Sequence, residues 1–492
     1  DTKVRSMDFA VTPLRDVVAQ FEGADLERVA ILASRSDFEA PYRYECHLPS
    51  DGHGLRDLGL QLLFARLVTI AAAIVGTSKL RIACGSDTTM DFIFEALAAH
   101  PAVKKNLEQF GELDIAKDAV DASADGASQL PFTKRSIPKA VSHRQSPDAQ
   151  LYVGVDYGRS DIKVAVLDLQ GTQLATYVTR WWMNGESGSR EYVDPAVLGS
   201  HGQHITCLAE AAMSALETVK DVDAKTICGF GVSAAGCVKS GKLCGIPPAM
   251  DGVDDREAAL KEFENLEHAI LNEVRKRFTI DPDCGTGLVN DGEASALYGA
   301  GRLPEGKMGL FLSCGTGLAG GVLCKGESCE GVLELGKVIM GLRRSGSDGV
   351  VPLHDSLQIA GAAQGMAGTQ RAFFNLLAAR GGELITDKAK QRAALVTMQD
   401  GELDDERRSL FDSMGRWLAR FVLELNEYLP SPVEYVEAGG KVTDGRTGRV
   451  MLDACQEELR DHGAEVEVHK ALDSEFGQAF AVANLVRPAS SG

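Results

Sequence analysis

The chain has 492 residues, of which 44% are hydrophobic and 25% charged, and its formal net charge is −19 at pH 7. This composition is typical of a globular protein, and the length suggests about three domain-sized units. The negative charge argues against nucleic acid or an anionic membrane as a partner, because long-range repulsion opposes both. The 11 cysteines contain no Cys-x-x-Cys pair, which indicates reduced thiols in the cytoplasm rather than a disulfide framework.

Residues 1–115 are predicted to form a separate α/β module of unknown role. Apolar patterning predicts two strands and two helices there, at residues 28–33, 79–83, 55–75 and 89–100. Gln61 and Arg66 interrupt the long apolar stretch 58–75, so we expect a buried helix rather than a membrane span. Residues 116–148 lose this periodicity, and we predict that they form a linker.

A glycine-containing turn follows the strand candidate at residues 151–155. Gly158 and Ser160 lie in this turn, before a second strand candidate at 162–167. Glycine lets backbone N–H groups approach phosphate oxygens closely, so the turn is predicted to bind a terminal phosphate. Asp156 is predicted to hold Mg²⁺ through water, since hard cations prefer oxygen ligands. An ordinary hairpin with a polar tip is the alternative.

Two histidines, His201 and His204, lie three residues apart in a polar segment. No carboxylate accompanies them there, so we expect surface residues rather than a metal-binding pair.

An acidic residue stands where a strand candidate meets the helix candidate at residues 293–302. This residue, Asp291, is placed to act as a general base that takes the proton from an attacking hydroxyl. A carboxylate at such a position is also a common helix N-cap, which is the alternative.

Two further glycine turns follow later in the chain. Gly315, Thr316 and Gly317 lie between two strand candidates and offer a hydroxyl and N–H donors to phosphate. Gly439 and Gly440 follow another strand candidate, and an adenosine could lie flat on their bare backbone. The alternatives are a tight hairpin turn and a strand-to-helix turn, respectively.

In this order, the motifs resemble those of the ROK family, within the actin-like, hexokinase and heat-shock ATPase superfamily. The family patterns D-x-G-G-T-K-I-K, N-D-A-N, G-T-G-x-G-G-G and G-G-G-V are similar to the stretches that begin at Asp156, Asn290, Gly315 and Gly439. The resemblance covers residues 150–487. It implies an α/β fold, a two-lobed actin-like ATPase with ribonuclease H-like lobes at 149–290 and 291–472. The helix at 473–487 is expected to return to the first lobe.

The resemblance also implies acceptor-binding residues. Ser233 and Gly236 lie in a stretch similar to the family's G-x-G-x-P-G-x-V loop, and Asn290 precedes the base. Glu334 and Lys337 stand in place of the family's E-x-G-H motif, with lysine instead of histidine. A desolvated lysine needs an anion, supplied either by Glu334 or by an acidic sugar. The family's cysteine-rich zinc motif has no counterpart here, so no zinc is expected.

The expected function is ATP-dependent phosphorylation of a hydroxyl on a sugar or sugar-like substrate, neutral or acidic, with ATP and Mg²⁺ as cofactors. The alternative is a catalytically silent, ROK-like sugar-binding or scaffold protein. Retention of both Asp156 and Asp291 favours catalysis, because a binder needs neither metal nor base. DNA binding is disfavoured, since residues 1–115 lack a helix-turn-helix pattern. A cytoplasmic homodimer is expected.

Overall fold

The computed structural model describes residues 9, 11–35, 41–50, 55–76, 79–99, 130, 132–133, 149–184, 190–236, 238–243, 253, 255–329, 334–343, 353–354, 357–381, 385, 388–400, 403–472 and 474–488. The chain divides into two compact units. Unit 1 consists of Asp1–Phe132, Leu303–Lys325 and Cys329–Ala471. Unit 2 consists of Thr133–Arg302, Gly326–Ser328 and Leu472–Gly492.

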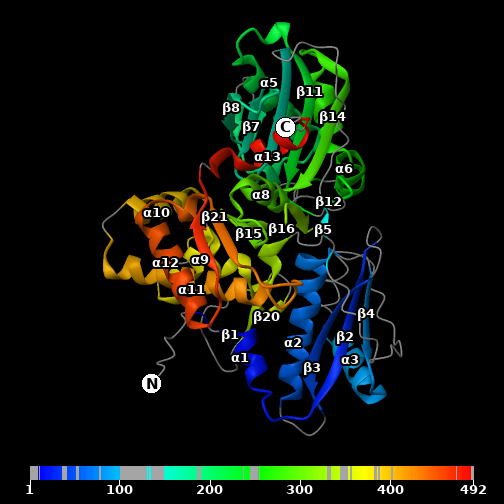
Figure 1. The fold of residues 1–492 in the computed structure, drawn as a ribbon, viewed down its shortest axis with the longest axis vertical. Coiled ribbons are helices and arrows are strands. Elements are labelled where there is room, and N and C mark those ends of the chain that lie inside the picture. The colour runs from blue at the N-terminus through cyan, green and yellow to red at the C-terminus, as the bar shows by residue number, and fades with distance from the viewer. Residues whose placement is uncertain are drawn as a thin grey trace. The chain divides into compact units, whose positions relative to one another are not determined.

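Unit 2 is built on a 5-stranded sheet of order β14-β11-β6-β7-β8 (Figure 1). Its strands are β6 (Gln150–Tyr157), β7 (Ile162–Leu167), β8 (Gln173–Thr179), β11 (Thr226–Ala234) and β14 (Ile280–Asn290). Strands β6, β7 and β8 form an antiparallel meander, whereas β11 lies parallel to β6 and β14 parallel to β11. This is the strand order of a ribonuclease H-like lobe.

Both faces of this sheet are covered. Alternate residues of β6 enter different hydrophobic clusters, with Val153 and Val155 in one and Tyr152 in another, as the two-residue period of a strand requires. The larger cluster includes side chains from helices α5 (His201–Glu217) and α7 (Leu266–Val274). The other face packs against the last helix, α13 (Gly477–Leu485).

Unit 1 repeats the same arrangement. Strands β22, β21, β15 and β16 lie side by side in that order, with β15 and β16 antiparallel and β21 and β22 parallel to β15. Their bounds are β15 (Met308–Cys314), β16 (Leu318–Cys324), β21 (Tyr435–Gly439) and β22 (Glu467–Lys470). Helices α11 (Asp405–Leu425) and α12 (Gly445–Asp461) pack together beside them (Figure 1). The repeated strand order confirms the predicted two-lobed fold class.

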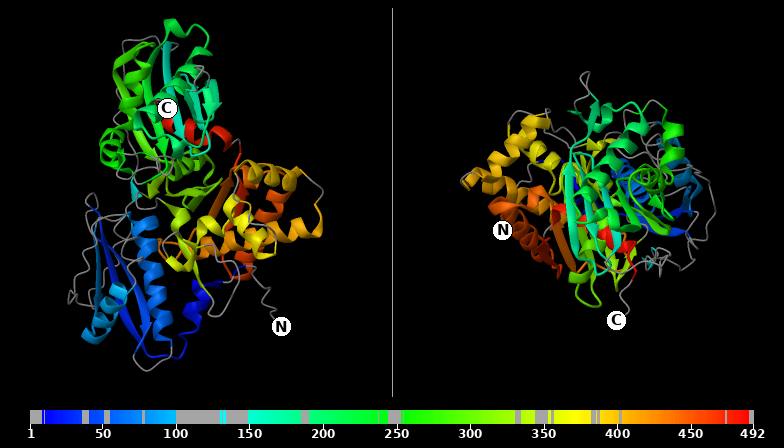
Figure 2. Two further views of the ribbon diagram at one scale, coloured as in Figure 1. Left: turned by 180° about the vertical axis from the view of Figure 1, so that it is seen from behind. Right: turned by 90° about the horizontal axis from the view of Figure 1, so that it is seen from above.

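The N-terminal part of unit 1 is a small α/β layer. Strands β2 (Leu26–Ser34), β3 (Tyr42–Pro49) and β4 (Lys79–Cys84) form an antiparallel sheet of order β3-β2-β4. Helix α2 (Arg56–Thr69) lies along this sheet and continues as the π-helical segment η1 (Ile70–Ile74), and α3 (Asp87–Ala99) follows β4 (Figures 1 and 2). In the described part of the chain, Arg56–Ile74 is the helix long and apolar enough to cross a membrane, and 83% of it is buried. This burial agrees with the expected core helix.

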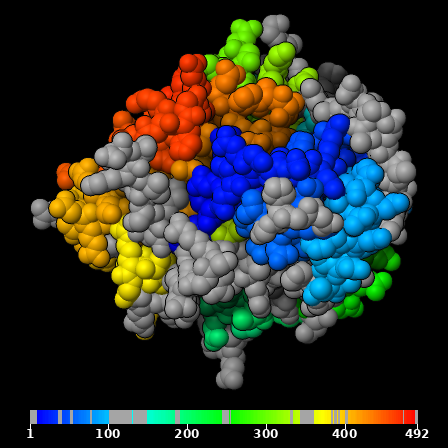
Figure 3. Space-filling view, turned by 90° about the horizontal axis from the view of Figure 1, so that it is seen from below, coloured from blue at the N-terminus to red at the C-terminus, as the bar shows by residue number. Residues whose placement is uncertain are grey.

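The N-terminal layer differs from the separate module predicted for residues 1–115. Its apolar side chains share one continuous hydrophobic cluster with those of α11 and the β15–β16 hairpin. Helix α2 is buried nearly all round, which a 3-stranded sheet on one side cannot achieve, so a second packing partner is required. At the surface, Arg15 of α1 (Leu14–Ala19) pairs with Glu427 at 2.9 Å. Figure 3 shows the dark blue N-terminal segment lying against orange segments from the later part of the chain. Most of the predicted linker lies outside the described residues.

Candidate functional site

Three of the predicted motifs meet at one edge of the unit 2 sheet. Asp156, Ser233 and Asn290 each stand at or next to the carboxyl end of one of the adjacent parallel strands β6, β11 and β14. In the sheet register Ser233 pairs with Asp156 and with Val289, and Ala234 pairs with Asn290. The carboxyl ends of parallel strands are the usual place for a ligand site in an α/β sheet.

Asp156 is a buried carboxylate with identified partners. Its Oδ1 accepts a hydrogen bond from the Ser233 hydroxyl at 2.9 Å, and Lys163 Nζ lies 3.9 Å from Oδ2. Burial raises the pKa of Asp156, although Lys163 and Ser233 act in the opposite direction. A single carboxylate suits Mg²⁺, which proteins usually hold with one or two carboxylates together with water and phosphate oxygens.

Gly158 forms the turn that follows Asp156. A Cβ at this position would lie 2.6 Å from the carbonyl oxygen of Asp161, so only glycine fits the close approach of the backbone. The Gly158 carbonyl accepts a hydrogen bond from Nε1 of the buried Trp181 at 3.0 Å. Ser160 lies exposed in the same turn. Trp181 therefore helps to hold the predicted phosphate turn, a role that no local sequence signal indicates.

Helix α8 (Asp291–Gly299) begins at the predicted base. Its N-cap is Asn290, whose Oδ1 accepts from Gly292 N at 2.8 Å and whose Nδ2 donates to the Gly236 carbonyl at 2.9 Å. Asn290 is the N-cap, and Gly292 N also donates to Asp291 Oδ1 at 2.9 Å, so Asp291 takes part in the first turn without being its cap. Asp291 is half-buried, and Gln478 of α13 donates to its backbone carbonyl oxygen at 2.9 Å.

A buried aromatic cluster lies beside this turn. The Tyr157 hydroxyl is 3.0 Å from Nδ1 of His204, and the Trp181 ring lies 5.1 Å from both the Tyr157 and His204 rings. His204 is 0% exposed, so its expected surface position is wrong. Its helix turns the side chain into the apolar core, where Tyr157 provides the polar partner. Burial lowers the pKa of His204 to about 4, although a backbone hydrogen bond at Leu198 opposes the shift.

This histidine should make the protein sensitive to acid. Between pH 6.5 and about 4 the unfolded chain binds a proton at His204 that the folded chain rejects, so stability falls as the pH falls through that window. The loss from this group is about 3 kcal/mol at most. Urea unfolding at several pH values should show a smaller acid-induced loss for His204→Gln. His201→Gln is the matched control, and equal slopes in wild type and His204→Gln would contradict the assignment.

Unit 1 brings together the two later glycine motifs. Gly315, Thr316 and Gly317 form the turn between β15 and β16, and Gly439 pairs with Ser313 at the end of the neighbouring strand β21. Gly440 has a φ of 95°, and a Cβ there would lie 2.6 Å from the Cys314 carbonyl oxygen. The two turns therefore lie side by side at the carboxyl ends of parallel strands.

The predicted acceptor segment also belongs to unit 1. Glu334 precedes the 3₁₀ turn η7 (Leu335–Lys337), and the Lys337 N–H donates to the Glu334 carbonyl at 2.8 Å. Both side chains are half-buried.

Among the described residues, no group of 3 or more His, Cys, Asp and Glu side chains could hold a metal ion. The stretch 351–356, where the sequence resemblance would place the zinc motif, is described only at residues 353–354. We expect the purified protein to contain no stoichiometric zinc, because four closely spaced nitrogen or sulfur ligands are needed for a structural site. Elemental analysis checks this, and about one zinc per chain would contradict it.

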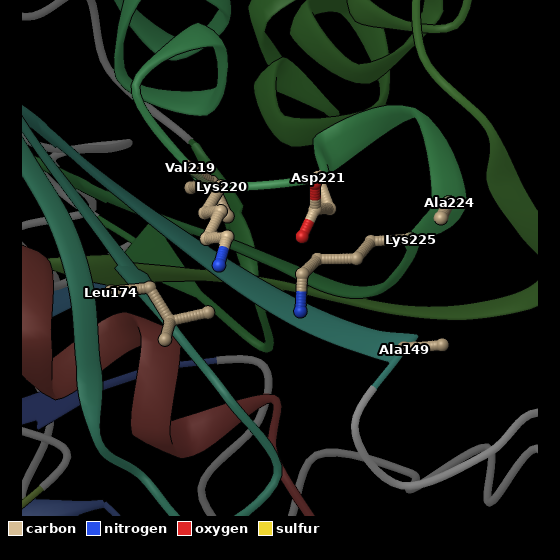
Figure 4. A pocket seen from close by; sticks show the side chains of 7 residues that line it. All are labelled: Ala149, Leu174, Val219, Lys220, Asp221, Ala224 and Lys225. Atoms are coloured by element: carbon tan, nitrogen blue, oxygen red, sulfur yellow. The ribbon is translucent and has the colours of Figure 1, made fainter.

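A cavity of about 400 Å³ lies elsewhere in unit 2, and none of the predicted site residues lines it. Figure 4 shows the side chains of Lys220, Asp221 and Lys225 directed toward its interior. Lys220 follows the carboxyl end of α5 by three residues, and Lys225 follows the 3₁₀ segment η4 (Val222–Ala224).

No protein-family model matches the chain, and no curated protein is similar to it in sequence. Solved structures are similar to it in fold. A ROK family glucokinase from Streptomyces griseus, solved with glucose and AMPPNP, is 20% identical with a TM-score of 0.45, over 68% of this chain and 99% of that chain. The ROK hexokinase from Thermus thermophilus is 19% identical with a TM-score of 0.42, over 68% and 97%.

A ROK family transcriptional regulator, a homologue of the E. coli MLC protein, is 13% identical with a TM-score of 0.43, over 87% of this chain and 96% of that chain.

Proposed function

We propose that this protein transfers the γ-phosphoryl group of ATP to a hydroxyl of a sugar or sugar-like substrate. The observation that carries the proposal is the meeting of Asp156, Ser233, Asn290 and Asp291 around the ends of adjacent parallel strands in unit 2. These residues come from three motifs that lie far apart in the chain. Phosphoryl transfer depends on positioning and charge neutralisation, which such a polar edge supplies.

Asp291 is the proposed general base. Its carboxylate takes the proton of the acceptor hydroxyl as that oxygen attacks the γ-phosphorus and the bond to ADP breaks. Asn290 is fixed by the Gly236 carbonyl and by the helix N-terminus, so its amide holds this end of α8 in place. Ser233 and Gly236 border the proposed acceptor position.

Asp156 would hold Mg²⁺ through water, and the metal would neutralise charge on the donor phosphates. The N–H groups of the turn at Gly158 and Ser160 are proposed to bind the terminal phosphate. Two turns of unit 1 are also proposed to bind the nucleotide. The phosphates would be bound by the turn of Gly315, Thr316 and Gly317, and the adenosine would lie on the backbone of Gly439 and Gly440.

A screen of neutral and acidic sugars with ATP and Mg²⁺, read as ADP release, tests the proposal. Release above the rate of ATP hydrolysis for at least one acceptor supports it. Sugar binding without ADP release across the whole screen would favour the alternative of a catalytically silent sugar-binding protein.

Glu334 and Lys337 are proposed to orient the acceptor. Replacing the ammonium in Lys337→Met should raise the acceptor KM and leave nucleotide affinity nearly unchanged, because this segment is proposed to contact the acceptor alone. The measurement is steady-state kinetics at saturating ATP, with binding of a non-hydrolysable nucleotide as the control. An unchanged acceptor KM would remove this segment from the proposed acceptor site.

Lys337→Met also shows whether the anion that pairs with the Lys337 ammonium comes from Glu334 or from the substrate. If the substrate supplies it, the rise in KM should be large for acidic sugars and small for neutral ones. If Glu334 supplies it, the rise in KM should be similar for both kinds of sugar.

A homodimer and a cytoplasmic location are also part of the proposal. Analytical ultracentrifugation tests the homodimer.

A further inference from the structure

The segment that carries Glu334 and Lys337 is held by the N-terminal layer. Strand β18 (Ile339–Arg343) follows η7 directly and lies in a sheet of order β1-β18-β20-β19. Its outer neighbour is β1 (Val11–Pro13), which pairs with it antiparallel, with Pro13 opposite Gly341. The N-terminal segment therefore covers one edge of the strand that extends the acceptor segment.

Helix α2 holds the start of the same strand. The Ile339 N–H donates to Oγ1 of Thr69 at 3.0 Å, and Thr69 is 0% exposed. The pairing of β18 with β20 (Leu357–Ala362) is irregular between Ile339 and Gly341, so the Thr69 hydroxyl takes a place where the regular ladder is interrupted. Directly after Thr69, the segment η1 packs against η7. Short π-helical segments are frequent at functional sites.

Helix α2 is itself fixed at this point. Arg66, one turn before Thr69 and on the same helix face, donates from Nη1 to the Tyr428 hydroxyl at 2.7 Å and pairs with Glu424. Burial raises the pKa of Tyr428, and the charge of Arg66 opposes the rise. The Tyr428 hydroxyl donates in turn to Glu424 Oε1 of α11 at 3.2 Å. The buried network of Arg66, Tyr428 and Glu424 thus anchors α2 one turn before Thr69, whose own hydroxyl binds the first residue of β18.

We infer that the N-terminal layer positions the acceptor-binding segment, with Thr69 as the positioning residue. This inference rests on the proposed function for the role of Glu334 and Lys337. The buried hydroxyl fixes the backbone at Ile339, two residues after Lys337, and β1 fixes the strand that follows. The N-terminal layer would thus contribute to acceptor binding without binding any ligand itself.

Thr69→Val removes the hydroxyl and keeps the side-chain shape. Because a buried N–H then loses its partner, we expect the acceptor KM to rise about tenfold. Affinity for a non-hydrolysable ATP analogue should stay within about twofold, since a loss confined to the acceptor side leaves nucleotide contacts intact. Thr69→Ser should restore most of the loss. Thr447→Val is the matched control, because within the described residues that buried hydroxyl has no hydrogen-bond partner.

Hydrogen exchange of the full-length protein provides a readout that is independent of activity. In Thr69→Val the amide of Ile339 should exchange at least about tenfold faster, while the amides of β6 stay unchanged. Thr69→Ala serves the same purpose if Thr69→Val does not fold. Unchanged exchange overturns the contact, and faster exchange with an unchanged acceptor KM overturns the positioning role. If wild type phosphorylates no acceptor but the exchange effect is present, the proposed function fails and the hydrogen-bond coupling stands.

Discussion

Asp291→Asn is expected to lower turnover by at least about a hundredfold, the usual scale for loss of a general base. The amide is nearly isosteric with the carboxylate, so the fold should be retained. Asn290 continues to cap α8 in the variant, because its own Oδ1 accepts from Gly292 N. Nucleotide affinity should change little. The measurement is kcat at saturating ATP and acceptor, with nucleotide binding followed separately.

Glu293→Gln is the control for this variant. Glu293 lies in the same first turn of α8 and accepts a hydrogen bond from Ser328 at 3.0 Å, which glutamine can still accept. Both variants remove one negative charge from the helix N-terminus, so both lose the same kind of dipole interaction, about 0.3–1 kcal/mol. A loss of turnover confined to Asp291→Asn supports the base. Equal losses would assign the effect to the helix end instead.

The strands that carry the motifs could be predicted from local sequence. An apolar run that ends in glycine and a polar residue is sufficient to predict β6 and β15, because both the strand and its turn are properties of neighbouring residues. Strand β3 is harder to predict, since Arg43 and Glu45 interrupt its apolar pattern. The structure pairs Glu45 with Arg28 of β2 at 2.7 Å, a partner 17 positions away.

The supporting residues of the candidate site could not be predicted, because their contact partners also lie far away in the sequence. Trp181 holds Gly158 across 23 positions, and Thr69 holds Ile339 across 270. Neither contact leaves a local pattern, because tryptophan and threonine are ordinary residues of a core and a helix. That the N-terminal layer belongs to unit 1 could not be predicted either, because it depends on how α2 packs in the folded protein. A helix that is apolar on most sides indicates burial without indicating what buries it.

Arg66→Met is expected to destabilise the protein by about 3–5 kcal/mol, the usual cost of breaking a buried ion pair by removing one partner. Arg66 and Glu424 are each 3% exposed, so the variant leaves the buried Glu424 carboxyl group without its cationic partner. The variant also removes the guanidinium that donates to Tyr428. Urea unfolding followed by tryptophan fluorescence measures the loss, since Trp417 belongs to the same core.

Two further variants separate the charge effect from lost packing. Arg66→Met combined with Glu424→Leu removes both charges, and such apolar replacements are often close to neutral, so most of the stability should return. Arg15→Met breaks the exposed pair with Glu427, whose side chains are 38% and 40% accessible, and should cost no more than about 1 kcal/mol. If the double variant is as unstable as Arg66→Met, lost packing rather than an unpaired charge is the cause.

The same network decides whether residues 149–492 can fold without the N-terminal layer. Deletion of residues 1–115 leaves Glu424 without Arg66 and exposes the apolar surface that α2 covers in the unit 1 core. Strand β18 also loses its neighbour β1. We therefore expect the truncated chain to be insoluble, or to show no cooperative transition in unit 1. A soluble chain with the melting behaviour of the full-length protein would contradict this expectation. It would show that α11 and the β15–β16 hairpin form a sufficient core without the N-terminal layer. The positioning role of Thr69 would then depend on hydrogen exchange of the Ile339 amide and on the acceptor KM.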